Sequence, residues 1–477
     1  MTAADIAVMA VYFAAVIAIG VHFTRRQQDA SDYFLGRHSL PWWAVMFSIV
    51  ATETSALTVI SIPGLGARGN LTFLQLPIGY LVGRVGVALW LLPGYFRGEQ
   101  VTAYQRLEAR FGPGTRRVAA GLFMGIRALG DSVRVFATAI PLAIVTGWSV
   151  PMSVVVVAVV TLLYTWGGGL QAVVWVDVVQ LVIYVLGGVA TVVVAAILIG
   201  DFGGALETAA AAGKLRVFDW SFSLSTTYTF WGGLVGGALL SAASHGTDHL
   251  IVQRLLATRK LSDARRALIG SGIIVIFQFA LFLFVGTMLW AVGAADPELS
   301  GDQLYPTFVV QQLPAGLAGL VVAGLLAAAM STVSSSLNSL ASATTHDFYA
   351  SVTGKRDPRH LLRVGRWATV GWAVVLTSGA LSFRSTDQPL VELAISIASI
   401  TYGALLGTYI LGGISRKVRQ ADAITAIVVA TASMLVIVLA KPGPFAELAL
   451  PWYVPLGTMI TLAVGWLSAL VRRSESA

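Results

Sequence analysis

One run of small and hydroxyl-bearing residues, inside a long apolar segment, has the spacing of an ion site. Ala328 lies three residues before Ser331 and four before Thr332. On a helix, its carbonyl oxygen and the two hydroxyls therefore converge on one point. Three neutral oxygens at one point suit a dehydrated monovalent cation. The alternative is that the hydroxyls only bond back to the preceding turn, or that the small residues only allow close helix packing.

A second polar cluster interrupts an earlier apolar segment at residues 51–55. It places the carboxylate of Glu53 midway along a predicted span, where a charge costs about 3 kcal/mol unless it faces protein or water. Irregular backbone at this depth persists only where it lines a cavity or is buried in protein. We expect an unwound segment that offers the carbonyl groups of Ala51 and Thr54 to a cation. A kinked helix with Glu53 paired to a neighbouring arginine is the alternative.

A third cluster, Arg127, Asp131 and Arg134, carries charge within another apolar segment. The spacing puts all three side chains on one helix face. Two guanidinium groups against one carboxylate leave a positive excess, and an arginine fork matches a carboxylate. The cluster therefore predicts a site for an anionic headgroup. An internal neutralised network is the alternative, and Glu53 could pair with one of these arginines, tune the ion site or receive a substrate ammonium group.

The composition shows what kind of protein positions these clusters. Of the 477 residues, 56% are hydrophobic and 11% are charged, whereas a soluble domain has about 25% charged residues. The chain is therefore predicted to be embedded in a lipid bilayer. The absence of cysteine excludes disulfides, thiolate metal sites and cysteine nucleophiles. His245 and His249 beside Asp248 form only a weak metal motif, so a transported monovalent cation is the only metal expected.

Other function classes lack their sequence features. A membrane enzyme needs an array of catalytic groups, and we find neither a histidine–metal motif nor a nucleotide-binding loop. A channel usually needs a symmetric pore with a selectivity loop, such as a ring of carbonyl groups. We therefore expect a carrier, not an enzyme, with no organic cofactor and no readable obligate protein partner.

Thirteen apolar segments are long enough to cross a bilayer as helices, which predicts an all-α membrane protein. They lie at residues 4–23, 41–66, 71–96, 118–147, 149–166, 170–200, 228–250, 267–294, 314–345, 361–383, 388–414, 421–440 and 452–471.

The basic residues orient these spans. Alternate connections hold 23 of the 31 lysines and arginines, Arg254 among them, while the other set holds five. Positively charged loops stay in the cytoplasm, so the N-terminus is expected outside and the C-terminus in the cytoplasm of the plasma (cell inner) membrane. This distribution explains the net charge of +8 without a nucleic-acid partner.

Two interrupted spans lie at corresponding positions. The second span is broken at residues 51–55, and the seventh, at 228–250, is rich in glycine. They are five spans apart, so a second copy of a five-span unit would enter the membrane inverted. Paired interrupted helices in two halves are a sequence indication of a transporter site.

Four stretches of the chain resemble the sodium/solute symporter family, which includes the sodium-glucose and sodium-proline cotransporters. They are residues 32–43, residues 168–180, residues 246–254, and the run from Ala328 to Ser339. The resemblance implies a leucine-transporter-like fold of five plus five inverted helices, with one helix before the core and two after it. The expected parts are an extra helix and loop at 1–40, a first repeat at 41–200, an extracellular loop at 201–227, an inverted repeat at 228–414, and two extra helices at 415–477.

The resemblance also implies a sodium site between the first and eighth core helices. Carried over, its ligands are the carbonyls of Ala51, Thr54 and Ala328 and the hydroxyls of Ser331 and Thr332. Asp177 would lie on the route of sodium to the cytoplasm. The family's signature usually has threonine before this aspartate, whereas this chain has Val176.

The expected substrate is a small carboxylate-bearing solute, either a monocarboxylate or an amino acid, that is taken up together with sodium. Residues 57–58 stand where the sugar carriers have a Glu-Gln pair, which argues against a sugar bound in their manner. A sodium-coupled sugar or polyol symporter and a proton-coupled carrier using Glu53 stay open. The candidate substrate residues are Glu53, Leu57, Thr58, Phe73, Gln75, Arg127, Asp131, Arg134, Phe136 and Trp231.

Overall fold

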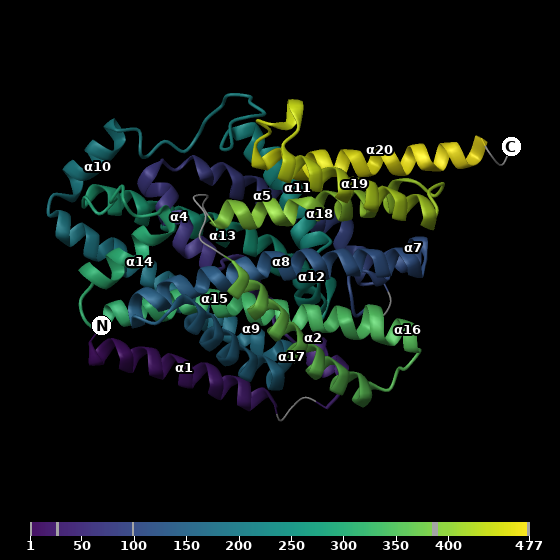
Figure 1. Ribbon diagram of the computed structural model, residues 1–477, viewed down its shortest axis with the longest axis horizontal. Coiled ribbons are helices and arrows are strands. Elements are labelled where there is room, and N and C mark those ends of the chain that lie inside the picture. The colour runs from purple at the N-terminus through teal and green to yellow at the C-terminus, as the bar shows by residue number, and fades with distance from the viewer. Residues whose placement is uncertain (1, 25–27, 98–99, 384–389, 475–477) are drawn as a thin grey trace.

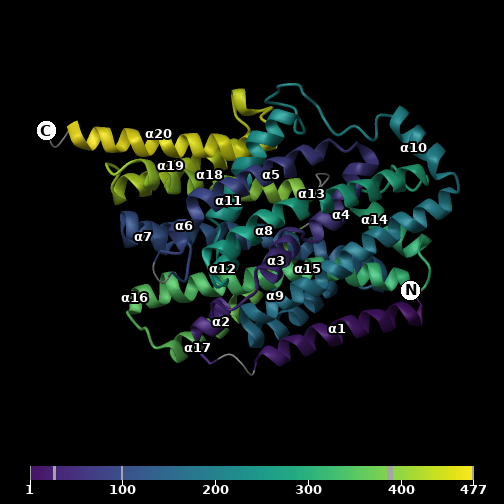
Figure 2. The ribbon, with the colours of Figure 1, turned by 180° about the vertical axis from the view of Figure 1, so that it is seen from behind.

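The computed structural model describes residues 2–24, 28–97, 100–383 and 390–474, and the secondary structure of these residues is helical apart from one isolated β-bridge between Leu40 and Thr258. Most of the long helices run along one direction, which is horizontal in Figure 1. α1 begins at the left of that view and α20 ends at the right. The view from behind in Figure 2 shows α3, α9, α12 and α15 gathered in the middle of the molecule.

The first half of the chain forms the helices up to α10. Their bounds are α1 (Ala3–Thr24), α2 (Ala30–Leu35), α3 (Trp42–Glu53), α4 (Ala56–Arg68), α5 (Gln75–Gly86), α6 (Leu92–Tyr95), α7 (Gln105–Phe111), α8 (Pro113–Thr146), α9 (Val150–Ile199) and α10 (Phe202–Ala211).

The second half forms the remaining ten. Their bounds are α11 (Gly237–Gly246), α12 (His249–Leu256), α13 (Leu261–Ala291), α14 (Gly301–Gln312), α15 (Leu317–Ala343), α16 (Ser351–Thr353), α17 (Pro358–Ser382), α18 (Leu390–Ile414), α19 (Gln420–Ala440) and α20 (Tyr453–Ser474). Short 3-10 or π-helical turns lie between several of them, including π segments at Val87–Leu91, Gly232–Gly236 and Thr344–Ala350.

Eight helical stretches in the described residues are long and apolar enough to cross a membrane, and a bent pair, α3 with α4, makes a ninth. Helices also occupy the other expected spans, namely 118–147 in α8, 228–250 in the stretch from Gly232 through α12, and 361–383 in α17. The apolar helices and the helical content confirm an all-α membrane protein.

Two expected spans fall within the single 50-residue stretch α9. A straight helix of that length would be about 75 Å long, more than twice the ~30 Å of bilayer hydrocarbon. The stretch is kinked at Gly169, which has a non-helical backbone with a φ of 56°. A β-carbon here would lie 2.5 Å from the carbonyl oxygen of Tyr33 in α2. Glycine therefore allows both the turn and the close contact.

The second expected span is broken as predicted. α3 ends at Glu53, Thr54 and Ser55 have non-helical ψ angles of 77° and 173°, and α4 begins at Ala56. The two helices are bent by 60°. The glycine-rich span is also interrupted, because the backbone leaves the helical conformation at Thr247 and Asp248, between α11 and α12.

α15, which carries the hydroxyl run, is the most enclosed of the candidate spans. In its most apolar window, 89% of the residues are buried, compared with 22% in α1. α15 packs against α1, α3, α8, α9, α12 and α17. The hydroxyls of Ser331 and Thr332 therefore face protein and not lipid.

Candidate functional site

The unwound end of α3 meets α15 at the predicted hydroxyls. The Thr332 hydroxyl lies 3.2 Å from the carbonyl oxygen of Thr52 and 3.4 Å from that of Ala328. The last carbonyls of a helix lack partners within it, so this end of α3 presents oxygens that a helix interior does not. Ala51 and Ala328 are fully buried, and Thr54, also buried, accepts a hydrogen bond from Gln278 of α13 through its hydroxyl.

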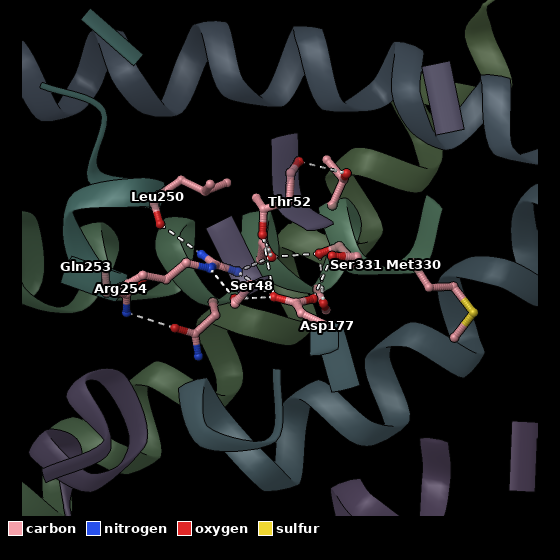
Figure 3. Close-up of polar contacts among 12 residues, drawn as sticks. Ser48, Thr52, Asp177, Leu250, Gln253, Arg254, Met330 and Ser331 are labelled. Atoms are coloured by element: carbon pink, nitrogen blue, oxygen red, sulfur yellow. Dashed lines mark hydrogen bonds and ion pairs between the residues drawn. The ribbon is translucent and has the colours of Figure 1, made fainter. Parts of the chain in front are cut away.

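Asp177 of α9 lies beside this point. Its Oδ1 accepts a 2.6 Å hydrogen bond from Ser331, and its Oδ2 accepts a 2.5 Å bond from Ser48 of α3. Arg254 of α12 is 3.3 Å from the same Oδ2. All four side chains are buried, and Figure 3 shows them converging from four helices. The structure thus brings the proposed sodium-pathway residue into contact with one proposed sodium ligand.

Glu53 is paired with an arginine, which was the alternative that the sequence left open. Its partner is Arg84 of α5, a fully buried side chain that also donates a 2.7 Å hydrogen bond to the hydroxyl of Ser271. The ring of His245 in α11 lies 3.7 Å from the same carboxylate oxygen of Glu53. The carboxylate therefore links the two interrupted helices, α3 and α11, and its charge is compensated.

The charged residues of α8 form an internal ion-pair network, which was the alternative to an anionic headgroup site, and an additional carboxylate joins it. Arg127 lies 3.1 Å from Asp131 and 3.5 Å from Asp248 at the break between α11 and α12. Arg134 is also paired with Asp131. Asp248 offsets the positive excess that the sequence suggested. Arg134 keeps 20% of its side chain exposed, whereas Arg127 keeps 9%, so Arg134 is the arginine with capacity left for a ligand.

A cavity lies between these clusters. It contains about 860 Å³ free of protein atoms, part of it open to solvent. Its wall includes five of the candidate substrate residues, namely Glu53, Thr58, Phe73, Arg127 and Arg134. The other polar lining residues are Thr52, Ser55, Tyr80, Ser241, Ser244, His245, Asp248 and Tyr402.

Four other candidate substrate residues, Gln75, Asp131, Phe136 and Trp231, do not line the cavity. The side chain of Gln75 bonds with the backbone of Thr72, Asp219 and Tyr228. Phe136 packs against Phe383, and Trp231 is 44% exposed and packs against Phe230. Asp131 is fully buried and forms ion pairs with Arg127 and Arg134. The side chain of Leu57 lies outside the described part of the chain.

Several site residues were not predicted. Arg84 pairs with Glu53 and Arg254 with Asp177, while Asp248 pairs with Arg127 and accepts a hydrogen bond from Tyr402. Ser48 and Ser335 contact Arg254 and complete what we call the hydroxyl cluster, namely Ser48, Thr52, Ser331, Thr332 and Ser335. Arg84 could have been found, because an arginine inside an apolar span requires a partner. Arg254 was counted among the cytoplasmic loop charges, yet it is fully buried.

The chain is similar to known transporters. The family profile "Sodium:solute symporter family" matches residues 33–440. The sodium/sialic acid symporter NanT of Aliivibrio fischeri is 30% identical, over 96% of this chain and 91% of that protein. The human sodium-coupled monocarboxylate transporter 2 is 29% identical, over 86% of this chain and 68% of that protein.

Solved structures show the same fold. A structure of a Na⁺-coupled sialic acid symporter, in a substrate-bound outward-open state with a novel Na⁺ site, is 25% identical and superposes with a TM-score of 0.89 over 98% of both chains. A nucleobase-cation-symport-1 family transporter in a closed conformation superposes with a TM-score of 0.58 at 14% identity, over 94% of this chain and 96% of that one. The fold is therefore leucine-transporter-like, and the chain belongs to the sodium:solute symporter family, whose members couple solute transport to sodium and are transporters, not enzymes.

Proposed function

We propose that this protein takes up a small carboxylate-bearing solute together with sodium, by alternating access. The main observation is the position of Arg134, a partly exposed guanidinium in the wall of a cavity that also borders Thr52, Glu53 and Ser55 at the break between α3 and α4. The end of α3 thus borders the solute cavity on one side. On its other side, Thr52 contacts Thr332 and Ser335 of α15.

The proposed sodium ligands are the carbonyls of Ala51, Thr54 and Ala328 and the hydroxyls of Ser331 and Thr332. The contact between Thr332 and the carbonyl of Thr52 supports this set, because it brings the broken helix and α15 together at the predicted point. Oxygen ligands suit a hard cation. We place Asp177 on the route between this site and the cytoplasm, since it accepts a hydrogen bond from Ser331.

The proposed substrate carries a carboxylate, which Arg134 would bind. The charges around the cavity favour this reading: Glu53 is compensated by Arg84, and Arg127 is held between Asp131 and Asp248. Arg134 alone of these arginines combines one carboxylate partner with appreciable exposure. The named substrates of two relatives, sialic acid and monocarboxylates, both carry a carboxylate.

An acidic sugar is the second candidate within this class. Sialic acid is a carboxylated sugar, and the cavity has neutral hydroxyls on Thr58, Ser241 and Ser244 that could bind hydroxyl groups of a substrate. This candidate differs from the neutral sugar or polyol of the sequence analysis in requiring Arg134.

We further propose thirteen membrane-spanning helices, with the N-terminus outside and the C-terminus in the cytoplasm of the plasma membrane. The kink at Gly169 supports the count, because it divides α9 into the two expected spans. The two interrupted helices, α3–α4 and α11–α12, support a five-plus-five core with one helix before it and two after it.

Uptake of radiolabelled solutes into proteoliposomes tests the proposal. The panel contains a monocarboxylate, an amino acid, sialic acid and glucose, each with an inward gradient of sodium chloride or of choline chloride. We expect sodium-dependent uptake of at least one of the carboxylates and none of glucose. Sodium-dependent uptake of glucose alone would overturn the role of Arg134, and uptake driven by a proton gradient without sodium would overturn the sodium coupling.

A further inference from the structure

The guanidinium group of Arg254 occupies the centre of the hydroxyl cluster. It is fully buried and has partners on every side (Figure 3). Its Nε donates to Ser48 at 2.9 Å, its Nη1 donates to the carbonyl of Leu250 at 2.8 Å, and its Nη2 contacts Asp177 at 3.3 Å and also the hydroxyl of Ser335. One side chain of α12 thus connects α3, α9 and α15.

The position of this group matters because of what lies next to it. Asp177 holds Arg254 through Oδ2 and the proposed sodium ligand Ser331 through Oδ1. Ser335 contacts both the guanidinium and Thr52, whose carbonyl reaches Thr332. The guanidinium is therefore a fixed positive charge of the protein, and only the carboxylate of Asp177 lies between it and the proposed sodium ligand Ser331.

A buried carboxylate requires a positive partner, and a second positive charge at the same carboxylate is repelled by the first. Sodium on the Asp177 route and the guanidinium at Asp177 therefore disfavour each other. The break at Thr247 and Asp248 precedes α12, which allows this short helix to change its position separately from α11. Movement of α12 would change the partner of Asp177.

We propose that Arg254 is an internal competitor of the transported sodium ion. In the arrangement seen here, its guanidinium satisfies Asp177, and sodium gains that carboxylate only when α12 withdraws the guanidinium. This inference rests on the proposed function, because it takes Asp177 to lie on the route of sodium. It makes Arg254 a positioning residue that sets how readily sodium enters or leaves.

The test measures sodium binding by the thermal stabilisation of the purified protein, with choline chloride replacing sodium chloride to hold the ionic strength constant. Arg254→Gln removes the competitor, and we expect its half-saturating sodium concentration to fall at least threefold. Arg254→Lys keeps the charge and should stay within twofold of the wild type. In the double variant Asp177→Asn with Arg254→Gln, the half-saturating sodium concentration should equal that of Asp177→Asn alone, because the carboxylate for which sodium and the guanidinium compete is absent from both proteins.

Arg116→Gln is the matched control. Arg116 is also a buried arginine, paired with Asp347 at 2.6 Å and with Glu108 at 2.6 Å, but it lies away from the hydroxyl cluster. Its loss should lower the melting temperature without changing the sodium midpoint.

An unchanged or raised midpoint in Arg254→Gln overturns the inference and makes Arg254 a structural support only. If this variant does not fold, Ser48→Ala replaces it, because that change removes the acceptor of the Arg254 Nε. A fall of about twofold in its midpoint supports the inference, and no fall overturns it. A wild-type protein without any sodium-dependent stabilisation or uptake would instead overturn the proposed function, so the two failures are distinguishable.

Discussion

At the scale of single residues, the proposed site separates the two ligands by chemistry. Sodium is offered carbonyl and hydroxyl oxygens, which hold a hard cation without the attraction of a full opposite charge. The solute is offered a guanidinium fork, which matches a carboxylate in geometry and charge. Glu53 at the end of α3 and Asp177 beside Ser331 already have arginine partners.

The first prediction concerns the hydroxyls of α15. Ser331→Ala or Thr332→Ala removes one proposed ligand, so the half-saturating sodium concentration for uptake should rise about tenfold, as expected for about 1.4 kcal/mol of lost binding. Ser336→Ala is the matched control, since Ser336 is a buried serine of the same helix whose hydroxyl has no hydrogen-bond partner among the described residues. Wild-type sodium activation in both ligand variants would show that the ligand set is wrong.

The second prediction concerns Arg134. A hydrogen-bonded charge is worth about 1.5–3 kcal/mol, so Arg134→Gln should raise the KM for a carboxylate substrate by roughly 10- to 150-fold. Arg134→Lys should recover only part of this loss, because an ammonium group cannot form the paired contacts. Arg117→Gln, an exposed arginine of the same helix, is the control for competition uptake assays. Equal KM values in Arg134→Gln and the wild type would remove the anchor from the proposal.

Some of the site could be predicted from sequence because it depends on residues close together in the chain. The spacing of Ala328, Ser331 and Thr332 fixes their helix face, and the polar run at 51–55 marks an interruption. The partners of Glu53, Asp177 and Arg127 could not be predicted in this way. They come from Arg84, Arg254 and Asp248, and only the packing of distant helices decides which charges meet.

At the scale of elements, the interrupted helices were predictable and the supporting ones were less so. The polar run at 51–55 indicated the first break, whereas the glycine run at 232–237 stays helical and the second break lies after it, at Thr247 and Asp248. α14 lies between two predicted spans, in a stretch where no helix was expected, although Ser300 and Gln303 form a capping box at its start. The π segments were also missed, because the hydrophobic pattern does not distinguish them from α-helix.

The third prediction tests how α1 supports α15. Asp5 of α1 accepts hydrogen bonds at 2.7 and 2.9 Å from the backbone N–H groups of Gly316 and Gly319, at the start of α15. The side chain thus caps the helix that carries the proposed sodium ligands. Asp5→Ala should cost about 0.5–2 kcal/mol, measured as the free energy of unfolding.

Asp201→Ala is the matched control for that prediction. Asp201 caps α10, a short helix with many exposed residues, by accepting one hydrogen bond of 3.0 Å from Gly204. Its substitution should destabilise the protein less than Asp5→Ala. An Asp5→Ala protein as stable as the wild type would mean that α1 does not stabilise α15 through this contact.

At the scale of the whole molecule, the fourth prediction tests the orientation. The chain has no cysteine, so single cysteines can be introduced at two exposed serines without a background signal. Ser225→Cys lies in the proposed extracellular loop and should react with a membrane-impermeant maleimide on intact cells. Ser351→Cys lies on the proposed cytoplasmic side and should react only after permeabilisation. The opposite pattern at either position would reverse the proposed topology.

The driving force sets what the assembled molecule can achieve. One charge moving across 100 mV gains about 2.3 kcal/mol, and a tenfold sodium gradient adds about 1.4 kcal/mol. Together, one sodium ion at ~150 mV supplies roughly 5 kcal/mol, which is enough to concentrate a neutral solute several thousandfold. When a solute with a single negative charge enters together with one sodium ion, no net charge crosses the membrane. The membrane potential then contributes nothing, and only the concentration gradient of sodium drives uptake. The number of sodium ions therefore decides how far such a solute is concentrated.

The last prediction follows from the shared position of Thr52. Thr52 borders the solute cavity, and its carbonyl oxygen lies 3.2 Å from the Thr332 hydroxyl at the proposed sodium site. Ligands that bind to the two faces of one unwound segment should order it together, so each should raise the affinity for the other. Linkage requires the two enhancement factors to be equal.

Calorimetric titration of substrate at low and high sodium, and of sodium with and without substrate, measures both factors. A factor of one in either titration would mean that the unwound segment does not couple the two sites, and coupling would then have to arise from a conformational change elsewhere in the molecule.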